Sequence, residues 1–246
     1  MPDSNTSPRS QRGAVPLNLL LGLGCLLALV VALATWRVES DDAPELSFDG
    51  LHLVEDAKVA IAYVEPEADF SVYDSFLMLE AYVAFKKNWQ RDTRVAGRRV
   101  SNADVERIKG EVATLLHETF RKELDEKGGY AFVEKPGDSV MILRPAIIDL
   151  VITAPDIAVP GRHQSYVASS GAATLFLEMY DSVSGDILAR VIDRRQVGNY
   201  GTVGWSNSVT NRADAQRMFR RWAGLLRSGL DEVRSEAGKP SMTPGG

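Results

Sequence analysis

The feature that most constrains this chain is an almost unbroken apolar run from Val15 to Trp36. About 20 apolar residues match the hydrocarbon thickness of a bilayer, whereas the apolar part of a secretory signal usually has only about 7–15. Arginines precede the run and several acidic residues follow it within residues 37–45. This asymmetry predicts that the N-terminus stays in the cytoplasm and that the rest of the chain is exported.

Three fates of residues 15–36 remain open. An uncleaved anchor would hold the chain in the inner membrane, facing the periplasm, with Trp36 at the outer interface. Cleavage after Ala34, where Ala32 and Ala34 occupy the two small positions that a signal peptidase reads, would secrete it. Lipidation at Cys25 would attach it through a lipid. The flanks favour the anchor, because the apolar run continues well past Cys25.

The composition divides the rest of the chain. Cys25 is its one cysteine, so no intrachain disulfide can form and the exported part depends on its hydrophobic core. With a net charge of -5 and no basic tract that rises above background, nucleic acid is not an expected partner. The expected segments are a cytoplasmic tail (1–14), the signal-anchor or signal peptide (15–36), an acidic linker (37–50), a single exported domain (51–235) and a disordered tail (236–246).

Strands and helices alternate within the exported domain. Short apolar or alternating runs predict strands at residues 59–64, 76–85, 130–133, 140–153, 173–180 and 187–197. Pro145 lacks an N–H, so its strand is expected to lie at a sheet edge or to be bulged there. The turn-forming residues 181–186 predict a hairpin between the last two strands.

Two long helices complete the pattern. The first begins at Ser101, where Asp104 three residues later allows a capping box, and it ends at Gly128-Gly129. The second begins near Asn211. Its predicted apolar stripe consists of Ala215, Met218, Phe219, Trp222, Leu226 and Val233. The opposite side carries Arg217, Arg220, Arg221 and Arg227, which we interpret as a solvated face rather than a site for lipid headgroups.

This order predicts an α+β fold, an antiparallel or mixed sheet with both helices packed on one face as a two-layer sandwich. The opposite face of the sheet would then need cover from residues 76–85, from a partner, or remain partly exposed.

Four stretches of the domain, 64–85, 142–156, 173–196 and 205–231, carry a family resemblance in matching order. They begin VEPEADFSVYD, ILRPAIIDL, ATLFLEMYD and WSNSVTNRA, respectively. The sequence resembles the bacterial envelope family called domain of unknown function 3313, whose members are of lipoprotein type. The resemblance implies an exported bacterial protein for which the family offers neither an established activity nor catalytic residues.

The residues themselves offer little chemistry. None of the three histidines, His52, His117 and His163, has a second ligand at metal-binding spacing, and His117 is expected to be an exposed helix residue. Neither a metal nor a cofactor is expected. Four strand or turn carboxylates are candidates for acid–base work: Asp149, Glu178, Asp181 and Asp193. Asp181 is better explained as a turn former, and Asp193 as a member of a cross-strand ion pair.

The sequence therefore favours a non-catalytic envelope module that binds another envelope protein, a cell-wall component or a second copy of itself. The alternative is a periplasmic hydrolase that uses the strand carboxylates. Following chain direction, loops 155–171 and 198–210 should emerge at the same end of the sheet. Their rigid or polar residues form the predicted partner site: Arg162, His163, Tyr166, Tyr200 and Trp205. An equally weighted interpretation is a pair of polar loops in which Trp205 packs under the final helix.

Overall fold

The computed structural model describes residues 43–95, 97–153, 165–167, 171–197, 204–206 and 208–237. The predicted cytoplasmic tail, the apolar run at 15–36 and Cys25 lie outside these residues, as does most of the C-terminal tail. Within the described residues, every helix is too short or too polar to traverse a lipid bilayer.

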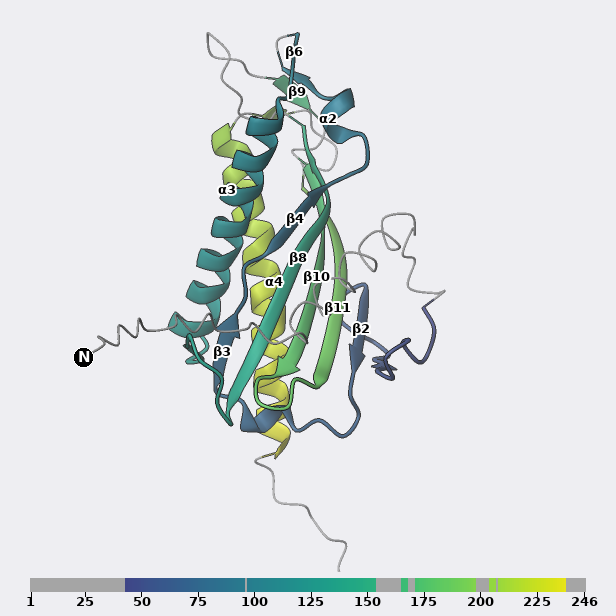
Figure 1. Ribbon diagram of the computed structural model, residues 1–246, viewed down its shortest axis with the longest axis vertical. Helices are drawn as coiled ribbons and strands as arrows, with labels where there is room; N and C mark the ends of the chain where they lie inside the picture. Colours follow the sequence, from purple (N-terminus) through teal and green to yellow (C-terminus); the bar gives the residue numbers. More distant parts are fainter. Residues whose placement is uncertain are drawn as a thin grey trace, which may run out of the picture. The chain divides into compact units, whose positions relative to one another are not determined.

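The domain is built on one eight-stranded mixed sheet (Figure 1). Its strands are β1 (His52–Leu53), β2 (Ile61–Val64), β3 (Ser75–Met78), β4 (Tyr82–Phe85), β7 (Ala131–Phe132), β8 (Val140–Ile152), β10 (Gly171–Asp181) and β11 (Ile187–Val197). They follow the order β1-β2-β11-β10-β8-β3-β7, and β4 also pairs with β8. Strands from β1 to β8 in this order are antiparallel, whereas β3 and β4 run parallel to β8. The sheet is therefore mixed.

Two small ribbons lie outside this sheet. One pairs β5 (Arg94–Val95) with β6 (Arg98–Arg99), and the other pairs β9 (Ser165–Val167) with β12 (Gly204–Ser206). Figure 1 shows β6, β9 and the short helix α2 (Trp89–Asp92) at the same end of the domain. The hairpin that joins β10 to β11 turns at the other end.

The first long helix, α3 (Asn102–Arg121), begins as predicted. Ser101 accepts a hydrogen bond from the Asp104 N–H, and the Asp104 carboxylate accepts one from the Ser101 N–H, which completes the capping box. A π-helical turn, η3 (Lys122–Glu126), extends the helix toward Gly129, whose φ of +72° suits a glycine that ends a helix.

The second long helix, α4 (Ser208–Ala237), begins three residues earlier than predicted. Met218, Phe219 and Trp222 are buried as expected, but Val233 is 36% exposed and is not part of the core. The arginine face also differs from the prediction, because Arg227 is half-buried and lies within 3.6 Å of the Glu123 carboxylate of η3. These differences arise because α4 packs against α3 and η3 as well as against the sheet.

Both long helices pack on the same face of the sheet, which confirms the two-layer α+β prediction (Figure 1). They begin at the same end of the domain and run side by side in the same direction. One hydrophobic cluster joins the layers, with Leu143, Ile147, Leu175 and Leu177 from the sheet and Leu116, Phe120, Phe219 and Trp222 from the helices.

The prediction for Pro145 is wrong, since β8 is a central strand of the sheet. Leu143 pairs with Met78 at the end of β3, and the next parallel pair joins Ala146 to Tyr82 at the start of β4. The Leu143 carbonyl faces β3, so strand alternation turns the Pro145 nitrogen toward the same side. Pro145 therefore lies where the neighbouring strand is interrupted, and its missing N–H leaves no ladder bond unmade.

The bulge in β8 lies further along, at Asp149. The pairing with β10 shifts there, and Asp149 has a φ of +50°, which Asp tolerates better than most residues. Leu143 and Ile147 face the helices before the bulge, and Leu150 does so after it. The bulge thus changes which alternate residues enter the core.

The opposite face of the sheet is covered in part by residues 43–53, which we call the N-terminal strap. The second half of the predicted linker belongs to this strap: Ser47 is buried, Leu46 forms a β-bridge with His52, and the Tyr63 hydroxyl donates to the Pro44 carbonyl. Residues 76–85, predicted as a strand and one of three alternatives for covering this face, belong to the sheet itself as β3 and β4.

Candidate functional site

The four candidate carboxylates lie apart. Asp181 accepts hydrogen bonds from the Val183 and Ser184 N–H groups, which confirms it as a turn former. Asp149 occupies the bulge of β8. Glu178 lies on the strap side of the sheet and Asp193 on the helix side. Because acid–base work needs two such groups at one point, the described structure does not assemble the predicted pair.

Asp193 is 3% exposed and is held by three donors. The Trp222 indole N–H donates to it over 2.7 Å, the Ala60 N–H over 3.0 Å, and the Arg195 guanidinium over 2.5 Å. The prediction of a cross-strand ion pair is therefore wrong, because Asp193 pairs with Arg195 of its own strand. Through these hydrogen bonds Asp193 connects α4 and β11 to Ala60, the residue before β2.

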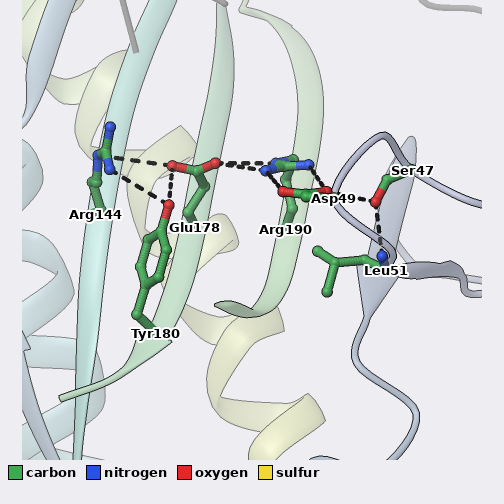
Figure 2. Close-up of polar contacts among 7 residues, drawn as sticks. All are labelled: Ser47, Asp49, Leu51, Arg144, Glu178, Tyr180 and Arg190. Carbon is green, nitrogen blue, oxygen red and sulfur yellow. Dashed lines mark hydrogen bonds and ion pairs between the residues drawn. The ribbon is translucent and has the colours of Figure 1, made fainter. Parts of the chain in front are cut away.

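The most elaborate polar arrangement is a chain of charged side chains on the strap side of the sheet (Figure 2). Arg190 of β11 lies at its centre, where its guanidinium donates to both Asp49 oxygens over 2.9 and 2.5 Å. The same guanidinium donates to Glu178 of β10 over 3.1 and 2.9 Å. The Tyr180 hydroxyl donates to the other Glu178 oxygen over 2.9 Å, and Arg144 of β8 lies 3.7 Å from it.

This network fastens the N-terminal strap to the sheet. The Ser47 hydroxyl donates to Asp49 over 2.6 Å and accepts from the Leu51 N–H over 2.9 Å, which folds the strap into a turn above Arg190. The Phe48 ring lies 5.0 Å from the Arg190 guanidinium carbon. The two arginines and the two carboxylates balance in charge, so the site has no net charge with which to attract an ionic substrate.

The pKa values of the network also oppose proton transfer near neutral pH. Burial raises the pKa of Asp49, but hydrogen bonds from Arg190 and Ser47 outweigh it and hold this pKa below the ordinary value. Burial lowers the pKa of Arg190, and its bonds to Asp49 and Glu178 more than reverse the effect. Burial and the adjacent Glu178 carboxylate raise the pKa of Tyr180. The network is suited to holding the strap and not to catalysis.

The histidines do not build a site within the described residues. His117 is half-buried, contrary to the prediction, because its ring meets the Phe132 ring edge-on with centroids 6.3 Å apart. His52 is exposed in β1, and His163 lies outside the described residues. Among the side chains that the structure describes, no group of three or more His, Cys, Asp or Glu residues could hold a metal ion.

The two predicted binding loops meet. β9 of loop 155–171 pairs with β12 of loop 198–210, and Tyr166 is directly opposite Trp205 in this ribbon. The prediction that the loops emerge at the same end of the sheet is therefore confirmed. Arg162, His163 and Tyr200 lie outside the described residues.

Sequence analysis missed a second feature of this end of the domain, the basic residues of segment 86–99. A local charge count would have found them, because Lys86, Lys87, Arg91, Arg94, Arg98 and Arg99 fall within fourteen positions. The fold adds that all six are exposed.

Comparisons with solved structures find distant likenesses. Protein XCC0632 from Xanthomonas campestris is 12% identical, with a TM-score of 0.40 over 72% of this chain and 94% of that one. The PelC dodecamer from Paraburkholderia phytofirmans is 11% identical, with a TM-score of 0.34 over 68% and 96%. A neuraminyllactose-binding hemagglutinin homolog from Helicobacter pylori is 12% identical, with a TM-score of 0.37 over 70% and 89%. At these values the likenesses carry no conclusion about function.

Among curated protein sequences, none matches this chain significantly. A sequence profile, in contrast, matches residues 47–226, which is well over half of the chain and includes the strap turn, the whole sheet and most of α4. On the extent of this match, the chain belongs to the family described as Protein of unknown function (DUF3313).

Proposed function

We propose that this chain is a non-catalytic binding module of the bacterial cell envelope. In this proposal residues 15–36 anchor it in the inner membrane, and the α+β domain faces the periplasm. The apolar length of the run and the charges on its two sides support the anchor and its orientation. The domain then captures an envelope protein, a cell-wall component or a second copy of the chain.

The observation that carries the proposal is the pairing of β9 with β12. Two separate loops, both rich in Ser and Gly and each with one Tyr, form one ribbon at an end of the domain. Loops of this composition on a rigid scaffold are typical of binding surfaces. The buried carboxylates Glu178 and Asp193, in contrast, are hydrogen-bonded within the fold, which supports a structural role.

Site-specific crosslinking tests the partner site. A photoreactive phenylalanine analogue replaces Tyr166 in the full-length chain, and the cells of its own host are irradiated. We expect one discrete adduct, whose mass distinguishes a second copy from another envelope component. The matched control places the same analogue at Val183, which is 65% exposed in the hairpin at the opposite end. Identical adducts from both positions, or none from position 166, would refute the site.

A variant tests the same surface by loss. Tyr166→Ala combined with Tyr200→Ala should abolish the adduct from a third photoreactive position in the same ribbon, Ser206, while the melting temperature stays nearly unchanged. Persistence of that adduct would show that the two tyrosines do not recognise the partner.

The anchor is tested separately. An uncleaved anchor predicts that the cellular protein keeps its N-terminus and stays in the membrane during carbonate extraction. Intact mass spectrometry reads the alternatives directly, because cleavage would give a chain that begins at Thr35 and lipidation would add a diacylglyceryl group to Cys25.

A further inference from the structure

Segment 86–99, which we call the basic ribbon, carries a charge opposite to that of the whole protein. It contains six basic residues and one acidic residue, Asp92, for a formal charge of +5, whereas the chain as a whole carries -5. Every basic side chain in it is exposed. The positive charge is therefore concentrated in one short, solvent-facing element.

A separate hydrophobic cluster, which contains Trp89, attaches the start of the basic ribbon to the domain. Trp89 of α2 is buried, stacks on Phe85 with ring centroids 3.8 Å apart, and donates from its indole N–H to the Ile152 carbonyl over 3.0 Å. Gln90 donates to the Val100 carbonyl over 3.2 Å. These contacts fix the backbone at Trp89 and Gln90 and join it to Val100, just past the end of the segment, which reduces the ordering that binding an anion there would need.

Inside the ribbon, two like charges face each other. Arg94 of β5 is directly opposite Arg99 of β6, a placement that is unfavourable without a counter-charge. No carboxylate among the described residues pairs with either arginine, or with Lys86 or Lys87. An anionic ligand would supply the missing counter-charge.

The arginines of α4 differ in this respect. Arg217 pairs with Asp214 of the same helix, and Arg227 with Glu123. That face is partly neutralised within the protein. The basic ribbon is the stronger candidate for an external anion.

We propose that the basic ribbon binds the phosphate headgroups of an anionic lipid bilayer. This rests on the anchor of the proposed function, which keeps a bilayer permanently within reach. Only residues 37–42 separate the apolar run from the first described residue, Ala43, and six residues span at most about 20 Å. Such a tether keeps the domain beside the bilayer. It must extend when the ribbon docks, because Pro44 contacts Tyr63, which pairs with Arg190 near the β10–β11 hairpin and so lies nearer the other end of the domain. Arginine forks match phosphate oxygens in bidentate geometry, and a short ribbon at the end of the domain suits a broad surface (Figure 1).

Docking at the basic ribbon would also determine where the proposed partner site lies relative to the membrane. The β5–β6 and β9–β12 ribbons lie at the same end of the domain (Figure 1). A domain docked on anionic lipid would therefore present the β9–β12 ribbon close to the headgroup layer, which favours partners at the membrane surface.

A fluorescent label at the ribbon tests the proposal in the full-length chain. Cys25→Ser removes the one native thiol, and Thr93→Cys, between Arg91 and Arg94, receives an environment-sensitive dye. The chain is placed in nanodiscs of phosphatidylcholine alone or with about one third phosphatidylglycerol. We expect a blue shift of the dye only with phosphatidylglycerol, reversed by about 0.5 M NaCl because salt screens the attraction.

Matched variants identify the residues. Arg94→Gln with Arg99→Gln should lower the ratio of docked to undocked domain about thirtyfold, since each basic residue near an anionic bilayer contributes about a factor of five. Arg220→Gln with Arg221→Gln removes the same charge from exposed positions of α4 and should leave the shift intact.

Each outcome decides the proposal. An equal dye spectrum in both lipid compositions, or an equal loss in both variants, overturns it. If the chain fails to enter nanodiscs, the anchor of the proposed function fails, and the same labelled chain is sedimented with phosphatidylglycerol vesicles. Salt-sensitive sedimentation that needs Arg94 and Arg99 would support lipid binding by the ribbon without the anchor. If the chain does not sediment with the vesicles, both the anchor and lipid binding by the ribbon are refuted.

Discussion

The hydrogen bond between Trp222 and Asp193 should be among the strongest single contacts that hold α4 to the sheet. Trp222 is 2% exposed, and its indole N–H reaches a carboxylate that is itself buried. Trp222→Phe keeps a ring in the core and removes this donor. A hydrogen bond to a charged group contributes about 1.5–3 kcal/mol. The smaller ring adds about 1–2 kcal/mol for the lost volume, so the total expected loss in the free energy of unfolding is about 2.5–5 kcal/mol.

A double-mutant cycle separates the hydrogen bond from the packing. In an Asp193→Ala background the indole N–H has already lost its acceptor, so Trp222→Phe should cost about 1.5–3 kcal/mol less than it does in the wild type. Leu230→Ala serves as the control partner. Leu230 is buried on the same helix but eight residues, about 12 Å, further along, and its effect should add to that of Trp222→Phe within about 0.5 kcal/mol.

Urea unfolding of the full-length chain in a mild detergent, followed by far-ultraviolet circular dichroism, measures all the variants. Fluorescence is avoided because the substitution removes a tryptophan. The slopes of the transitions must agree between variants for the free energies to be compared. A coupling below about 0.5 kcal/mol between Trp222 and Asp193 would show that the contact does not stabilise the fold as argued.

Three further results are expected. Gly110→Ala should stabilise the protein by about 0.5–1 kcal/mol, because a Cβ there meets nothing within 4 Å in the middle of α3, and a lower melting temperature would contradict this. Gly171→Ala should destabilise the protein by about 1–3 kcal/mol, since the added Cβ would lie 2.3 Å from the Val151 carbonyl oxygen. An unchanged urea midpoint would mean that β8 and β10 move apart easily at this point. Asp49 has a lowered pKa in the folded state, so its contribution to stability is present above its ordinary pKa of 3.8 and is lost as the pH falls through the lower folded value. Melting temperatures between about pH 6 and 3 should therefore fall less steeply in Asp49→Asn than in the wild type, and parallel curves would count against the strap contact.

The elements that the sequence predicted well depend on residues close together in the chain. The Ser101 capping box, the Asp181 turn and the burial of Trp222 were all correct. The first two are made within three residues, and the third follows from a helical repeat. The meeting of the two loops was also predictable, because chain direction along three successive antiparallel strands determines where each loop emerges.

The candidate site was predictable only in part. The structure pairs Tyr166 with Trp205 in one ribbon, and the role of these residues in binding stays a prediction. The basic ribbon was not predicted, because the net charge of -5 was taken over the whole chain and masks the positive charge of segment 86–99. Its significance depends on the register that places Arg94 opposite Arg99, which a charge count does not contain.

Only the tertiary structure decided the remaining features. Arg190 and Asp49 are 141 positions apart, and Asp193 and Trp222 are 29 apart, so neither contact has a local signature. Pro145 is tolerated in a central strand because β3 ends and β4 begins beside it, and that break belongs to other parts of the chain. Local patterns specify helices and turns because their stabilising bonds join near neighbours. Strand order, register and the partners of buried charges depend on which distant segments pack together, and that outcome is set by the whole core at once.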